Sequence, residues 1–186
     1  MSSSTIKIWN AETGVCLRTM RYHYNIRSLM LNGVNNVVAG YENGFIKVWE
    51  VDTGVCRQTL EGNDKWDMAL IEMQGDLLVC KGADRTTANI WNMSTGACLQ
   101  TLAGPKKHTG PITGVGVNSK LAVTSSEDGK VKLWDVQTGD FIRDLLQLET
   151  GGKVMKMIMK EAKIVCDVLS NEGSKIIVLN FDTNSD

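Results

Sequence analysis

The sequence predicts an all-β fold built from about four to five repeated units, each a four-stranded antiparallel sheet. Three observations support this prediction: a phrase that recurs about every 40 residues, alternation of apolar and polar residues within it, and glycine turns at fixed places. The phrase centres on a tryptophan in four of its copies. These are Trp9, Trp49, Trp91 and Trp134, at intervals of 40, 42 and 43 residues in a chain of 186.

Each copy of the phrase predicts two strands joined by a turn. The copies read IKIWNAETGVCLRTM from Ile6, IKVWEVDTGVCRQTL from Ile46, ANIWNMSTGACLQTL from Ala88 and VKLWDVQTGDFIRDL from Val131. The residues before the tryptophan alternate and are rich in β-branched types, which favours a strand. The Thr-Gly pair that follows supplies a turn, because glycine tolerates a positive φ. A fifth, weaker copy begins at Ile176 and has Leu179 in the tryptophan place.

Two further strands precede each phrase, so a complete unit has four. We expect them at 26–31 and 36–39 in the second unit and at 112–117 and 121–125 in the fourth. In the fifth unit, residues 151–169 have good helix propensity. Their place in the repeat instead predicts strands at 153–159, 163–168 and 174–181.

The strand count predicts one repeat array over residues 1–186, with units ending near 20, 60, 102, 145 and 186. The chain opens on the third and fourth strands of a unit and stops after the third strand of another. We therefore expect an incomplete array, whose remaining units would belong to a longer protein. The alternative is a small closed ring in which Trp9 and residues 176–181 share one sheet.

The composition argues against several classes of function. The chain has 20 Lys plus Arg and 21 Asp plus Glu, a net charge of −1, so no basic excess favours nucleic-acid binding. No apolar run is long enough to span a bilayer, and Ser2 to Ser4 do not begin a secretory signal. We expect a protein of the cytoplasm or nucleus, without membrane or nucleic-acid partners.

The cysteines predict neither a metal site nor disulfides. There are five, none in a C-x-x-C pair, and only two histidines accompany them. Cys16, Cys56 and Cys98 each open the strand after a turn, and we expect them to pack as small apolar side chains between units. No cofactor is predicted.

The repeated phrase resembles the WD-repeat β-propeller family, in which Trp-Asp closes the third strand of each blade. Trp134-Asp135 is a literal match, whereas Asn10, Glu50 and Asn92 follow the other tryptophans. The resemblance implies a hydrogen-bonded network within a blade. In the fourth unit its members would be His108, Thr124 or Ser126, Asp128 and Trp134, and in the second unit His23, Asn43 and Trp49.

The resemblance also implies a non-catalytic scaffold that binds protein or peptide partners. Its candidate partner-binding face comprises Arg27, Glu42, Asp67, Arg85, Thr113 and Glu127. The phrase from Thr95 to Leu102 is similar to that of F-box/WD-repeat proteins, which implies the substrate-recognition part of a ubiquitin ligase. Partners would then include substrates and the remaining blades of a longer propeller.

An enzyme is the alternative function. His108, Ser126 and Asp128 form the residue set of a hydrolase triad, and such triads occur on unrelated folds. No G-x-S-x-G elbow surrounds a serine, however. The structural network uses the same residues without chemistry, so we predict no catalytic site.

Overall fold

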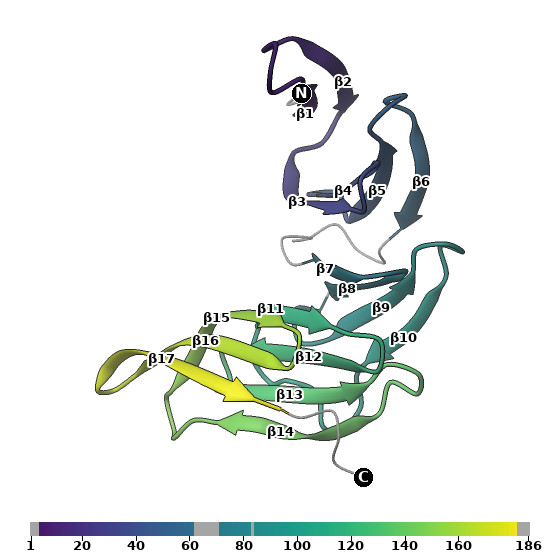
Figure 1. Ribbon diagram of the computed structural model, residues 1–186. Helices are drawn as coiled ribbons and strands as arrows, with labels where there is room; N and C mark the ends of the chain where they lie inside the picture. The colour runs from purple at the N-terminus through teal and green to yellow at the C-terminus, as the bar shows by residue number, and fades with distance from the viewer. Residues whose placement is uncertain (1–3, 62–70, 83, 182–186) are drawn as a thin grey trace. The chain divides into compact units, whose positions relative to one another are not determined.

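The computed structural model describes residues 4–61, 71–82 and 84–181, and within these ranges the chain is all-β (Figure 1). It divides into two compact units, residues 1–71 and 72–186. The first unit contains six complete strands: β1 (Ser4–Trp9), β2 (Cys16–Tyr22), β3 (Ile26–Asn32), β4 (Asn36–Tyr41), β5 (Phe45–Glu50) and β6 (Cys56–Glu61).

The second unit contains the other strands. The boundary between the two units falls within β7, the first strand named below. They are β7 (Ile71–Gln74), β8 (Leu77–Lys81), β9 (Ala88–Asn92), β10 (Cys98–Leu102), β11 (Ile112–Val117), β12 (Leu121–Ser126), β13 (Lys130–Asp135), β14 (Phe141–Gln147), β15 (Lys153–Lys160), β16 (Lys163–Ser170) and β17 (Gly173–Asn180).

The strands form five sheets in which each strand pairs with its neighbours in sequence. We call them the first sheet (β1–β2), second sheet (β3–β6), third sheet (β7–β10), fourth sheet (β11–β14) and fifth sheet (β15–β17). The described pairings are antiparallel, as expected. The predicted all-β fold is confirmed, and the helical alternative for residues 151–169 is wrong, because β15 and β16 occupy that segment. The closed-ring alternative stays a prediction.

The turn after the repeat tryptophan explains why the next residue is Asp or Asn in three of the four copies. In the fourth sheet, Asp135 Oδ1 accepts hydrogen bonds from the backbone N–H groups of Gln137 and Thr138, at 2.7 and 2.9 Å. Asn10 and Asn92 accept from the same kind of turn. The glycine of the turn, Gly139 in this copy, has φ +76°, which an L side chain rarely adopts. A short acceptor and a glycine together therefore specify the turn.

The core of the first unit lies between the first and second sheets. Ile6 and Met20 pack against Val37, Ala39 and other side chains of the second sheet. Trp9 differs from the other repeat tryptophans, because it is 55% exposed, whereas Trp49 and Trp91 are each 8% exposed. Trp49, Trp91 and Trp134 therefore act as core residues, and Trp9 does not.

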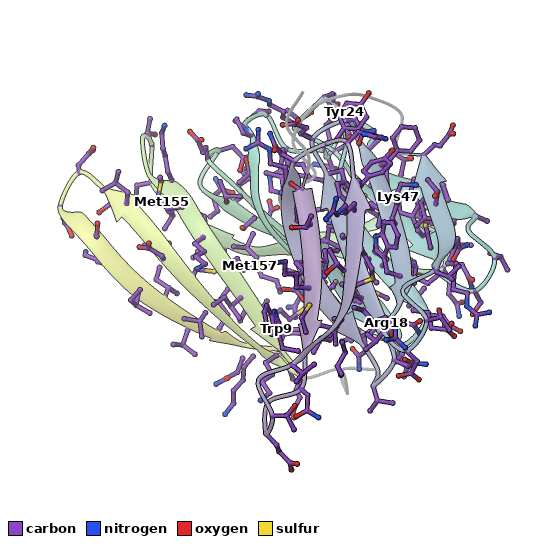
Figure 2. All side chains as sticks on the ribbon, turned by 90° about the horizontal axis from the view of Figure 1, so that it is seen from above. Trp9, Arg18, Tyr24, Lys47, Met155 and Met157 are labelled. Atoms are coloured by element: carbon purple, nitrogen blue, oxygen red, sulfur yellow. The ribbon has the colours of Figure 1, made fainter. Side chains whose placement is uncertain are left out.

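The core of the second unit joins the fourth and fifth sheets, which lie side by side in Figure 1. Met157 is buried in this interface, whereas Met155, two residues earlier on β15, is exposed (Figure 2). Two glycines of β11 let β15 approach closely. A Cβ added at Gly114 would lie 2.6 Å from Met157 Cβ, and one at Gly116 would lie 2.7 Å from Met159 Cβ. Those positions therefore require residues without a side chain.

The prediction that the repeat cysteines pack between units is wrong for Cys98, which is exposed. Cys16 and Cys56 are half-buried, and Cys56 packs against the core of the first unit, as predicted. Each of these two thiols also lies beside the backbone carbonyl two residues along its own strand, at 3.4 Å for Cys16 and 3.3 Å for Cys56. Each cysteine also sits at a register shift opposite the repeat tryptophan, where the strand is irregular.

Candidate functional site

Four side chains of the fourth sheet and its preceding loop form one continuous hydrogen-bonded chain. His108 Nδ1 lies 2.9 Å from Asp128 Oδ2, and its Nε2 lies 2.8 Å from Thr124 Oγ1. Trp134 Nε1 donates to the same Thr124 oxygen at 2.9 Å. With Asp128 ionised, every group is satisfied if His108 is neutral and carries its proton on Nδ1, so that the Thr124 hydroxyl donates to Nε2. His108, Thr124 and Trp134 are fully buried, and Asp128 is the partly exposed end of this network.

Of the two hydroxyl residues that the sequence left open, Thr124 is the partner of His108. Ser126 Oγ instead donates to the carbonyl of Gly110 at 2.8 Å and accepts from the backbone N–H of Asp128 at 3.1 Å. Ser126 is also fully buried. It therefore does not occupy the nucleophile's place in a triad with His108 and Asp128, and the hydrolase arrangement is not formed.

Asp128 is the anionic end of the network. Burial opposes its ionisation, but the interaction with His108 and the hydrogen bonds from the backbone N–H groups of Thr109 and Lys130 outweigh this effect. Together they lower the pKa of Asp128 to about 2. The carboxylate holds the loop before β11 against the hairpin after β12, so it positions two loops at one end of the sheet.

In the second sheet, different residues provide the hydrogen-bond acceptor for the repeat tryptophan. Trp49 Nε1 donates to Tyr41 Oη at 3.1 Å, and the ring of Tyr22 packs edge-on against that of Tyr41 at 4.6 Å. Asn43, which the sequence singled out, donates its side-chain amide to Tyr22 Oη at 3.3 Å. His23 is exposed and is not in this network, so its predicted place is taken by Tyr22. The signal for this was a tyrosine on the second strand, which can accept from an indole.

In the third sheet, the indole N–H of the repeat tryptophan has no good hydrogen-bond acceptor. Trp91 Nε1 is buried and has no hydrogen-bond partner of normal strength. It faces the thiol of Cys80, a weak acceptor at the register position that Thr124 holds in the fourth sheet. Burial raises the pKa of that thiol to about 12. The structural role of the repeat tryptophan is thus fully satisfied in the second and fourth sheets only, among those that the structure describes.

Three residues of the predicted partner-binding face lie at one end of the second unit. Arg85 is exposed, and its carbonyl accepts a hydrogen bond from the N–H of Ile112 at 2.7 Å. Thr113, the residue after Ile112, donates its hydroxyl to the carbonyl of Val154 at 2.7 Å. Glu127 forms an ion pair with Lys153 at 2.9 Å. These bonds run from the third sheet to the fifth, so they place the loop ends of three sheets beside one another.

Arg85 is held in an unusual conformation. Its φ is +63°, which is uncommon for a residue with a side chain. The preceding Asp84 accepts hydrogen bonds from the backbone and hydroxyl groups of Thr86 and Thr87. Although burial acts in the opposite direction, these bonds hold the pKa of Asp84 well below its usual value. The hairpin is therefore built around an ionised Asp84, with Arg85 projecting at its tip.

The remaining face residues fall elsewhere. Arg27 and Glu42 belong to the first unit and form an ion pair at 3.4 Å. Glu42 also accepts from Asn25, and these bonds from Asn25 together with the charge of Arg27 lower the pKa of Glu42. Asp67 lies outside the described residues. The structure thus brings together Arg27 with Glu42, and Arg85 with Thr113 and Glu127.

The described ranges contain neither a candidate metal site nor a membrane-spanning helix. No group of three or more His, Cys, Asp or Glu side chains there is arranged to hold a metal ion. In the same ranges no helix is long and apolar enough to cross a membrane.

Comparison with known proteins agrees with this geometry. A family model, "WD domain, G-beta repeat", matches residues 96–135, which include the Trp134-Asp135 pair. The F-box/WD repeat-containing protein sel-10 of Caenorhabditis elegans is 42% identical over 65 residues, which cover 32% of this chain. The match spans only 11% of that protein's length.

A solved structure resembles the fold over most of the chain. The crystal structure of the computationally designed Ika4 protein matches with a TM-score of 0.68 and 25% sequence identity, covering 87% of this chain and 94% of that chain. The fold of this designed propeller and the WD-repeat model agree with the recurring tryptophan phrase. By this phrase, this family model and this fold, the chain is similar to the WD-repeat β-propellers, and residues 96–135 match a WD repeat.

Proposed function

We propose that this chain is a non-catalytic scaffold that recognises protein substrates for a ubiquitin ligase. WD repeats are protein-interaction modules in general, and that much follows from the family. The finer assignment is supported by the similarity to sel-10, whose name places it among F-box/WD-repeat proteins. The chain covers about a tenth of that protein, so the partner and the ligase remain part of the proposal.

The observation that carries the proposal is the row of loop ends in the second unit. Arg85, Thr113 and Glu127 lie on consecutive sheets that are cross-linked by the hydrogen bonds and the ion pair described above. Beneath them, the network from Asp128 to Trp134 is buried and fully paired. A rigid support under exposed charges of both signs suits recognition of a protein surface, because little ordering is needed on binding.

Affinity purification tests the interaction surface. The whole chain would be used as bait, and the proteins it retains would be compared with those retained by Arg85→Glu, quantified by mass spectrometry. Arg85 points away from the core, so this variant should fold, and we expect it to lose at least one protein that the wild type retains. Lys120→Glu is the matched control, since it reverses an exposed charge on the β11–β12 hairpin, at the far end of the neighbouring fourth sheet. Equal losses in both variants would contradict a surface at Arg85.

A second measurement tests the ligase assignment separately. Overexpressing the chain should change the half-life of the proteins that depend on Arg85 for capture, either by promoting or by blocking their ubiquitylation. If those proteins are captured but keep their half-life, the scaffold stands and the ligase assignment is wrong.

Three further parts of the proposal follow from the sequence. We propose that the chain has no catalytic activity, which the buried and fully bonded Ser126 supports. We propose that it acts in the cytoplasm or nucleus without binding nucleic acid or membranes. We also propose that the remaining blades of a longer propeller are among its partners.

A further inference from the structure

The fifth sheet has a pocket at the place where the fourth sheet buries a histidine. In the fourth sheet, the ring of His108 fills the space between the loop before the first strand and the end of β12. Val168 holds in the fifth sheet the register position of Ser126, since each pairs with the buried residue just before the register shift of its first strand, Val154 and Ile112 respectively. The preceding loop of the fifth sheet carries Thr150 instead of a histidine and leaves a pocket of about 310 Å³. That volume is at the lower end of the range for ligand pockets, large enough for one side chain.

The walls of the pocket are apolar and its rim is charged. Leu148, Val168 and Ile177 form the walls. Glu149, Glu172 and Lys175 are the charged groups at its rim. Lys175 is paired with Glu172, which lowers the pKa of that carboxyl group. Glu149 has no ion pair within the described part of the chain, so the pocket carries one uncompensated negative charge.

The backbone around the pocket is held in place on both sides. The loop is closed by a hydrogen bond from Gly152 N–H to the carbonyl of Glu149 at 2.9 Å. A Cβ at Gly152 would lie 2.7 Å from Leu148 Cβ, so the loop has no room to vary here. On the opposite side, Ser170 Oγ donates to the carbonyl of Gly173 at 3.2 Å. The pocket is therefore formed before any ligand arrives, which reduces the cost of binding.

We propose that this pocket binds the side chain of an arginine or lysine in an extended segment of a partner protein. Such a side chain has an apolar stem, which suits Leu148, Val168 and Ile177, and a cationic end, which suits Glu149. Gly152 of the pocket lining is followed by Lys153, which pairs with Glu127, so a segment that follows the row of loop ends from Arg85 leads to the pocket. The inference rests on the proposed scaffold function and names the kind of segment that the scaffold recognises.

A titration with a small probe tests the pocket directly. N-acetyl-L-arginine amide would be added to the ¹⁵N-labelled full chain and followed by backbone amide chemical shifts. We expect saturable shifts confined to residues 148–152 and 168–177. N-acetyl-L-citrulline amide has nearly the same shape without the charge, and we expect it to bind at least about 5-fold more weakly, since the charged contact is lost.

The variant Glu149→Gln isolates the contribution of the rim carboxylate. It should weaken arginine binding about 3- to 10-fold, the range for a partly exposed charged hydrogen bond, while its spectrum shows that the fold is kept. Glu161→Gln is the matched control, because Glu161 is an exposed acid in the hairpin at the other end of β15 and β16. Equal binding of citrulline and arginine, unchanged binding by Glu149→Gln, or shifts spread over other regions would each overturn the proposal.

The outcome is separable from that of the proposed function. If the probe does not bind while capture of partners still depends on Arg85, the pocket proposal fails and the scaffold stands. If the probe binds as expected while Arg85→Glu loses no partner, the pocket stands and the surface at Arg85 is wrong.

Discussion

One hydrogen bond joins Trp134 to Thr124 and satisfies the buried indole N–H of the fourth sheet. The indole N–H of Trp134 donates to Thr124 Oγ1 at 2.9 Å, while the Thr124 hydroxyl lies 2.8 Å from His108 Nε2. With His108 neutral and protonated on Nδ1, this single hydroxyl serves as acceptor for the indole and donor to the imidazole. Both neighbours would be left without a partner if it were lost.

Replacing Thr124 by valine tests this dual role. The side chain keeps its shape, but the Trp134 N–H and His108 Nε2 both lose their partner in a fully buried site. We expect the free energy of unfolding to fall by about 2 to 4 kcal/mol, measured by urea denaturation. Thr109→Val is the control, since Thr109 is exposed and contributes only its backbone N–H to Asp128. Equal effects of the two variants would show that the hydroxyl is not needed.

The stability of the second unit should depend on pH through Asp128. The pKa of this residue is lowered from 3.8 to about 2 in the folded chain, so the ionised carboxylate favours folding. A depressed pKa contributes stability that is fully present above the unfolded value and is lost as the pH falls from about 4 towards 2. We expect a loss of about 2 kcal/mol over this range, measured by chemical denaturation at several pH values.

The variant Asp128→Asn checks the assignment of that pH dependence. It should be less stable than the wild type at pH 7 and should show a flatter profile between about pH 4 and pH 2. Asp76→Asn, an exposed carboxylate in the β7–β8 hairpin, should leave the slope unchanged. A wild-type slope that survives in Asp128→Asn would assign it to another group.

Trp91 and Trp134 provide a matched pair for measuring a missing acceptor. Both are buried and occupy the same place in their sheets, but Trp91 Nε1 has no partner of normal strength. Trp134→Phe loses a good hydrogen bond, whereas Trp91→Phe removes an N–H that was poorly satisfied. We expect Trp91→Phe to be the less destabilising change by about 1 kcal/mol or more, measured by thermal unfolding. The opposite order would mean that the Cys80 thiol is an adequate acceptor.

Gly116→Ala should separate the fourth and fifth sheets slightly. The added Cβ would lie 2.7 Å from Met159 Cβ and 2.8 Å from its sulfur, which is too close without a shift of β15. We expect a loss of about 1 to 3 kcal/mol in unfolding free energy and increased amide exchange in β15. Ser119→Ala, at an exposed position of the adjoining hairpin, should change neither. Wild-type stability in Gly116→Ala would show that the interface is looser than the distances indicate.

The sequence alone predicted most of the fold for a definable reason. Strand pairing follows a two-residue alternation, and the Trp phrase sets its phase in every copy, so β11 begins and ends at the predicted residues. The repeat even overruled helix propensity between residues 151 and 169. The structure places His108, Asp128 and Trp134 together, and the resemblance to the family had named all three.

Features of the structure that are not part of the repeated motif could not be predicted from the sequence. Tyr22 and Tyr41 replace the expected histidine network in the second sheet, because an aromatic hydroxyl reaches the indole from another strand position. Trp9 matches the phrase yet is exposed, since burial depends on what packs against a sheet.

The local code of alternation, turn residues and repeat spacing was therefore determined by the sequence, because each of these acts between residues close in the chain. Which hydroxyl meets His108, which tryptophan lacks an acceptor and where a pocket opens beside Val168 were decided only by tertiary packing. These features depend on distances of a few tenths of an ångström between side chains that are far apart in sequence, and no residue pattern carries that information.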